Sequence, residues 1–278
     1  MSNASIRIEQ LMLPTYPEPG KEEMPLFSEH RVHQRSTGRP YPNKVVLEVN
    51  RERKIERSYT VVHLENEYLD VLVLPEIGGR IFAARDKVTD YDFFYRQHVI
   101  KPGLIGALGS WISGGVEFNW PYHHRPSGFL PCDFETEECG DGSVICWLSE
   151  HDPIDRMKGM VGIVLKPGCA YLETRVKLCN RTPVTKSFLW WENAAVPVNE
   201  SYKIFFPKDV TYVNFHYLDS RISYPIAGDA TFNGIDMTTA RDISWHKNTK
   251  DATSYFACAS QYDFFGGYDH GLDCGVVH

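Results

Sequence analysis

Short strand-like segments separated by turn signals follow one another along most of this chain. In the clearest of them, residues 171–178, polar or aromatic side chains alternate with mostly apolar ones. A period of two is the pattern of a β-strand that buries one face and exposes the other. Turn signals such as Gly140-Asp141-Gly142 and Pro167-Gly168 lie between the segments. No stretch convincingly follows the helical period, so the sequence predicts an all-β protein.

The predicted strands are short, numerous and separated by frequent turns. This pattern is typical of a sandwich of large antiparallel sheets. Residues 207–252 are rich in loop-forming residues. The strands are expected at residues 45–50, 59–66, 69–76, 80–85, 91–95, 132–139, 143–151, 159–168, 170–180, 186–199, 202–207 and 253–259.

The domain organisation is predicted from the two ends of the chain. Ser2-Asn3-Ala4 resembles the remainder of a cleaved tag, so residues 1–4 are set aside. Residues 5–44 carry six prolines, which predicts an extended arm with at most one strand. Residues 45–278 form the β domain. Its last residues, Gly-Val-Val-His, carry no turn signal, and we expect the domain to lack its closing strands.

Composition excludes several classes of function. The 278 residues carry a formal net charge of −7, which argues against nucleic acid and anionic membrane surfaces as partners. There is no run of about 18 apolar residues and no signal-peptide pattern, so a cytoplasmic protein is expected. The seven cysteines form no Cys-x-x-Cys pair. We therefore expect reduced thiols, no metal site and no other cofactor.

The loop from Gly109 to Pro131 carries the densest set of candidate functional side chains. Glu117 lies in an apolar run, where a carboxylate is costly unless it has partners. Aromatic faces beside a carboxylate and imidazoles suit a polyol with apolar ring faces, which is a sugar. The structural alternative is an ordered loop whose tryptophans cap a core and whose Glu117 is paired. The candidates in this loop are Trp111, Glu117, Trp120, His123 and His124.

The two histidines point to different sides if the loop is extended, so at most one of them faces a pocket. That one is a candidate acid or hydroxyl-binding group. A zinc site needs three or four ligands, and no second cluster of ligand residues is present.

Two further pairs are candidates. In a strand, Trp190 and Glu192 share one face. If that face lines the pocket, the indole offers a surface on which a sugar ring stacks, beside the carboxylate. The alternative is a solvated Glu192 with Trp191 in the core. Asp269 and His270 follow a Gly-Gly turn and are candidates for a late acid–base pair.

Three stretches together resemble the galactose mutarotase-like superfamily: PEIGGRIFAARD (75–86), SGGVEFNWPYHHRP (113–126) and LWWENAAVPVN (189–199). With residues 263–278 they are similar to the uncharacterised bacterial family DUF5107, whose members often carry tetratricopeptide repeats downstream. This resemblance implies an antiparallel β-supersandwich with a sugar-binding concave face. It also implies that Arg80 is a hydroxyl-binding cation on the pocket floor. The strand at Glu192 lacks the histidine acid expected of a mutarotase.

Three functions are compatible with these residues, and we favour the first. It is a carbohydrate-active enzyme of the glycoside hydrolase or epimerase type that acts on a mono- or oligosaccharide. The second is a non-catalytic carbohydrate-binding domain of a larger protein, and the third is a β domain that organises a downstream repeat region. The predicted catalytic residues are Glu117, His123 and Glu192, and the predicted sugar-binding residues are Arg80, Trp111, Trp120, His124, Trp190, Asp269 and His270.

Overall fold

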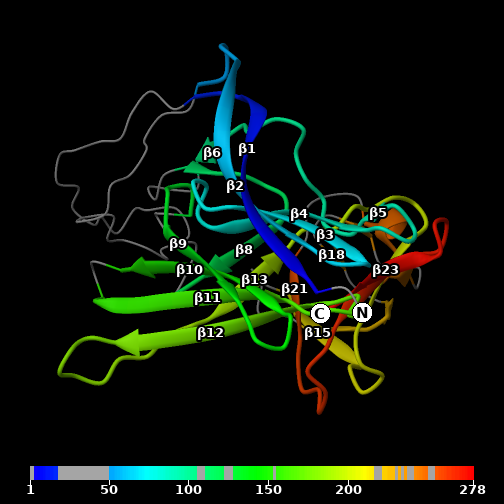
Figure 1. The fold of residues 1–278 in the computed structure, drawn as a ribbon. Coiled ribbons are helices and arrows are strands. Elements are labelled where there is room, and N and C mark those ends of the chain that lie inside the picture. Colours follow the sequence, from blue (N-terminus) through cyan, green and yellow to red (C-terminus); the bar gives the residue numbers. More distant parts are fainter. Residues whose placement is uncertain are drawn as a thin grey trace. The chain divides into compact units, whose positions relative to one another are not determined.

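The computed structural model describes residues 3–17, 50–104, 110–121, 128–152, 155–215, 221–228, 231–232, 235–236, 241–249 and 254–278. These residues form antiparallel sheets without an α-helix, and the helical structure among them is the short 3-10 turn His246–Asn248 (Figure 1). The prediction of an all-β protein is confirmed. The chain forms two compact units, Met1–Ala195 and Val196–His278, which are described separately.

The largest sheet of the first unit has the strand order β1-β2-β3-β4-β8-β13, with β5 paired to β4. Strand β1 pairs with β2 over all eleven of its residues. The arm predicted at residues 5–44 therefore begins as a strand of the main sheet, and its remainder lies outside the described residues. The strands are β1 (Ser5–Thr15), β2 (Ile55–Glu65), β3 (Leu69–Leu74), β4 (Arg80–Asp86), β5 (Tyr91–Asp92), β8 (Val116–Asn119) and β13 (Trp191–Ala194).

A second sheet of the first unit has the order β12-β11-β10-β9, and its four strands lie side by side in Figure 1. The strand predicted at residues 170–180 is present as an edge strand, but the face expected to be buried is exposed at Thr174 and Val176. Thr174 and Val176 pair with the buried residues Ile163 and Val161 of the neighbouring strand. The strands are β9 (Asp133–Glu138), β10 (Val144–His151), β11 (Met157–Leu165) and β12 (Leu172–Asn180); a separate two-stranded pair is β6 (Gly103–Leu104) with β7 (Ser110–Trp111).

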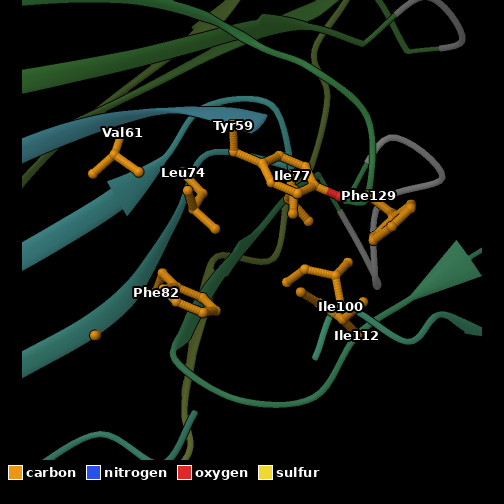
Figure 2. Close-up of a cluster of buried hydrophobic side chains, with 9 residues drawn as sticks. Tyr59, Val61, Leu74, Ile77, Phe82, Ile100, Ile112 and Phe129 are labelled. Atoms are coloured by element: carbon orange, nitrogen blue, oxygen red, sulfur yellow. The ribbon is translucent and has the colours of Figure 1, made fainter. Parts of the chain in front are cut away.

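One hydrophobic cluster of the first unit lies on one face of the largest sheet. Tyr59, Leu74 and Phe82 project from three strands of this sheet and meet side chains from the connecting loops, including Ile112 (Figure 2). Removing each large apolar side chain from water contributes about 1.5–3 kcal/mol. The hydroxyl of Tyr59 remains satisfied at 3.0 Å from Thr15 Oγ1. This core therefore fixes β2, β3 and β4 against the loops that precede β8.

The other face of the sheet packs toward β9–β12. The buried indole of Trp120 lies against Gly159 of β11 so closely that a Cβ at Gly159 would be 2.1 Å from the ring. A glycine at residue 159 therefore leaves the space that Trp120 fills. A Cβ at Gly79 would lie 2.6 Å from Cys132 Sγ and 3.2 Å from the side chain of Leu148 of β10.

The second unit is built from short strands. One sheet has the order β14-β22-β23 and another the order β16-β15-β21. Its core contains Val213 and Ile222, so the loop-rich segment 207–252 contributes both strands and buried side chains. The strands are β14 (Tyr202–Phe205), β15 (Tyr212–Phe215), β16 (Arg221–Ser223), β17 (Ile226–Ala227), β18 (Thr231–Phe232), β19 (Ile235–Asp236), β20 (Arg241–Asp242), β21 (Tyr255–Ala257), β22 (Gly266–Asp269) and β23 (Cys274–Val277).

Across the described ranges, the chain has no helix of the length and apolar character needed to span a membrane.

Candidate functional site

Three adjacent strands bring Glu117 into a row of polar side chains. Asn193 of β13 is the register partner of Glu117 in β8, and Ile81 of β4 is the partner of Val116. Antiparallel partners share one face of a sheet. One further step along this register sets Arg80 beside Glu117. A row from Arg80 through Glu117 to Asn193 therefore crosses β4, β8 and β13 on a single face.

The row is largely buried and its members are hydrogen-bonded. Arg80 is 2% exposed and Glu117 is 5% exposed, whereas Asn193 is only half-buried. The Asn193 side-chain Nδ2 donates to Glu117 Oε2 over 3.2 Å. Arg80 is also the register partner of Leu74, which belongs to the core in Figure 2. The row thus extends from the core toward the half-buried side chain of Asn193.

The guanidinium of Arg80 holds the segment that leads into β8. Its Nη1 donates to the carbonyl oxygens of Ile112 and Gly114, each at 3.0 Å, and its Nε lies 3.4 Å from the oxygen of Ile77. The resemblance implied a cation that binds sugar hydroxyls. These three contacts make Arg80 a positioning residue for the loop, and its role toward a sugar stays a prediction.

The Gly114-Gly115 pair provides a turn and a close backbone approach. Both residues have positive φ, at +98° and +68°. The Gly115 N–H donates to the oxygen of Tyr95 over 2.6 Å, and a Cβ on Gly115 would lie 2.0 Å from the oxygen of Ile81. The close approach is to the chain's own backbone, and it sets β8 against β4 one residue before Val116.

Glu192 lies on the opposite face from Glu117. Its register partner is Phe118, whose neighbours along β8 face the other way. Trp190 stacks on Phe118, with ring centroids 6.2 Å apart, and on Trp120 at 5.7 Å. Glu192 accepts a hydrogen bond of 3.0 Å from Thr174 Oγ1 of β12. Trp190 and Glu192 share a face as predicted, but the register does not bring Glu192 together with Glu117.

The remaining candidates of the first unit are not part of the row formed by Arg80, Glu117 and Asn193. Trp120 is buried, with 4% exposed, between Trp190 and Gly159. Trp111 is half-buried on the short strand β7. His123 and His124 lie outside the described residues.

Asp269 and His270 belong to the second unit. Asp269 is 2% exposed and accepts hydrogen bonds from Asn199 Nδ2 at 2.6 Å, Gly271 N at 2.8 Å and Leu272 N at 3.2 Å. It therefore closes the turn between β22 and β23. His270 is exposed, and its ring lies 5.0 Å from that of Trp245. These contacts give Asp269 a structural role that the isolated Asp-His pair did not reveal.

Replacing Asp269 with alanine should accelerate amide hydrogen exchange at Gly271 and Leu272 by about tenfold or more, because both amides lose their acceptor. Exchange measured by NMR checks this result. Asp263→Ala, at an exposed position outside this turn, is the control and should leave both amides unchanged. Equal exchange in the two variants would contradict the role given to Asp269.

Two partly buried phenols of the second unit are not acid–base groups at neutral pH. Burial is the main cause that raises the pKa of Tyr224 to about 12, and it raises the pKa of Tyr255 as well. Both pack against the apolar core of the unit and remain protonated. In the part of the chain that is described, no group of three or more His, Cys, Asp or Glu side chains is arranged to hold a metal ion.

Sequence reasoning missed Asn193 as the partner of Glu117. The segment Trp190-Trp191-Glu192-Asn193 shows that Asn193 faces away from Glu192. It carries no signal of which residue of β8 lies opposite, because strand register depends on the pairing.

Comparison with known proteins gives one family and one solved structure. The model of a domain of unknown function, DUF5107, matches residues 37–278. The crystal structure of a TPR-domain containing protein from Parabacteroides distasonis ATCC 8503 superposes with a TM-score of 0.79 and 21% sequence identity. The match covers 99% of this chain and 44% of that one, so this chain spans less than half of the other protein's length. At this identity the likeness shows the fold alone.

Proposed function

The chain belongs to the DUF5107 family, a family of unknown function, and from its own residues we propose that it is a carbohydrate-binding domain. The observation that carries the proposal is the row Arg80, Glu117 and Asn193 on one face of the sheet. A carboxylate accepts hydrogen bonds from sugar hydroxyls, and a side-chain amide both donates and accepts them. Asn193 is half-buried, so the sugar would contact the row at β13.

Binding is favoured over glycoside hydrolysis by the strand register. Hydrolysis uses two carboxyl groups that flank one glycosidic bond. Glu117 and Glu192 lie on opposite faces of β8 and β13 and do not form such a pair. Acid–base catalysis of the epimerase type would instead combine Glu117 with His123. This epimerase activity is the alternative function, and the experiment below tests it as well.

The fold that we propose for the domain is the β-supersandwich of the galactose mutarotase-like superfamily. Support comes from the two sheets of the first unit, which meet through Trp120 and Gly159. We also propose that tetratricopeptide repeats follow this domain in a longer protein. The solved neighbour is described as a TPR-domain containing protein, and the match leaves more than half of it uncovered.

Saturation-transfer NMR with a panel of reducing sugars tests the proposal, with anomer exchange followed in the same samples. A sugar that receives saturation should bind Glu117→Gln about tenfold more weakly than the unaltered chain, because a neutral amide is the poorer acceptor for its hydroxyls. Glu200→Gln, at an exposed glutamate of the second unit, is the matched control and should bind normally.

The outcomes separate the candidate functions. Saturation transfer without faster anomer exchange supports a binding domain, and accelerated exchange that is lost in Glu117→Gln supports the epimerase. Equal binding by Glu117→Gln and the unaltered chain, or no transfer from any sugar, would overturn the proposed site.

A further inference from the structure

We propose that the outer face of the β9–β12 sheet is a second binding site, which takes an acidic oligosaccharide with hexuronate rings. A groove of about 570 Å³ lies on this face, a volume within the range of small-ligand sites. The groove shares no residue with the row at Glu117, so the inference does not rest on the proposed function. Its lining side chains include Asp133, Glu135, Trp147, Ser149, Lys158, Met160 and Lys177.

Trp147 forms a fixed platform in this groove. Its partner in β11 is Gly162, and a Cβ there would lie 2.7 Å from the indole, so the ring rests directly on the strand. The indole Nε1 donates to Glu137 Oε2 over 2.7 Å. The neighbouring residues Cys146 and Leu148 are buried on the other face of β10. Trp147 is therefore held outward in one orientation.

The platform holds a cation that has no carboxylate partner within the described ranges. Lys177 Nζ lies 5.1 Å from the centroid of the Trp147 ring, an arrangement in which the π face attracts the ammonium. Lys177 pairs with Met160, two residues along β11 from Lys158, so the two lysines are diagonal neighbours on this face. Among the described residues, neither lysine forms an ion pair. Two ammonium groups on this side of the groove are thus available to an anion.

The opposite side of the groove carries hydrogen-bond acceptors. Asp133 and Glu135 project from β9 on the far side of Trp147 and Ser149. They would repel a simple anion that filled the groove, but they accept hydrogen bonds from hydroxyl groups. Ser149 also lines the groove; within the described chain its buried Oγ has no hydrogen-bond partner.

A sugar acid matches this division of charge. Its carboxylate would meet Lys158 and Lys177, its hydroxyls would meet Asp133 and Glu135, and its C–H groups would lie over Met160. A neutral sugar would leave both ammonium groups unused, and a small inorganic anion would leave the acidic side unused. The groove therefore selects a ligand that carries an anion and hydroxyls together.

Isothermal titration of the whole chain with trigalacturonic acid tests the inference, with galactotriose and inorganic phosphate as comparison ligands. Trigalacturonic acid should bind, and Lys158→Met and Lys177→Met should each weaken it by about tenfold, because a charge-assisted contact is lost. Lys166→Met is the matched control, because Lys166 is already paired with Glu173 and does not line the groove. This control should leave the affinity unchanged.

Three results would overturn the assignment. These are no binding of trigalacturonic acid, unchanged affinity in both lysine variants, or an affinity for phosphate or galactotriose that is equal and is weakened equally by the lysine variants. Glu117 lies outside the groove, so the two proposals are tested independently. A failed titration with trigalacturonic acid would not affect the proposed sugar site at Glu117, and a failed saturation-transfer experiment would not affect the proposed groove. Circular dichroism of each variant should show that the fold is retained, because the substituted lysines lie on the surface.

Discussion

Arg80→Met should lower the free energy of unfolding of the first unit by about 2 to 5 kcal/mol. The substitution keeps an unbranched side chain in a buried position but removes the donor to the carbonyl oxygens of Ile112 and Gly114. A buried acceptor that loses its donor costs about 1–3 kcal/mol. Urea denaturation followed by tryptophan fluorescence measures the change, since five of the six tryptophans lie in this unit.

Arg85→Met provides the comparison on the same strand. Arg85 is exposed and forms ion pairs with Asp70 and Asp90. Exposed pairs contribute up to about 1 kcal/mol, so Arg85→Met should have a small effect. If Arg80→Met were equally mild, the carbonyls of Ile112 and Gly114 would not depend on the guanidinium, and the role of Arg80 as a positioning residue would be wrong.

Gly115→Ala should destabilise the first unit by about 3 kcal/mol or more, or prevent its folding. The residue has φ +68°, and the added Cβ would lie 2.0 Å from the oxygen of Ile81. That oxygen belongs to the backbone of β4 and cannot swing aside, so β8 would have to move away from β4. Glu117 and Asn193 would move with it, and sugar binding at this site should weaken together with stability.

The control is Gly140→Ala, and denaturation in urea again measures the change. Gly140 has an ordinary φ, and a Cβ there would have nothing within 4 Å. Its replacement should change the stability by at most about 1 kcal/mol, with a small gain from the less flexible unfolded chain. Equal stability of the Gly115→Ala and Gly140→Ala proteins would show that β8 does not need the close approach to Ile81.

Local pattern predicted the longer strands of the first unit but not the partners of any strand. It was wrong at β8, which lies inside the segment Gly109–Pro131 that was expected to be a loop. The alternation along β12 predicted the strand and which of its residues share a face, because side chains in a strand have a period of two. The face expected to be buried is exposed at Thr174 and Val176. The same rule placed Trp190 and Glu192 on one face. It could not place Glu117 relative to them, because a shift of one residue in the pairing of β8 with β13 would reverse the faces.

Close packing was also beyond prediction from the sequence. The sequence did not indicate that residue 159 must be glycine. The requirement arises because the buried indole of Trp120 lies against it. Adjacent glycines favour positive φ, and Gly114-Gly115 forms such a turn. That the tight contact is with Ile81 depends on which strands become neighbours. Arg80 likewise becomes a loop anchor only when the segment from Ile112 to Gly114 folds back onto it.

The strand order has a consequence for synthesis on the ribosome. The chain completes β8, then makes the whole β9–β12 sheet, and only afterwards supplies β13 as the outer neighbour of β8. Until then β8 has an unpaired edge, and such an edge is a template for association with other chains. The nascent protein is therefore most prone to aggregation while residues 120–190 are being translated, and chaperone contact should be concentrated in that interval.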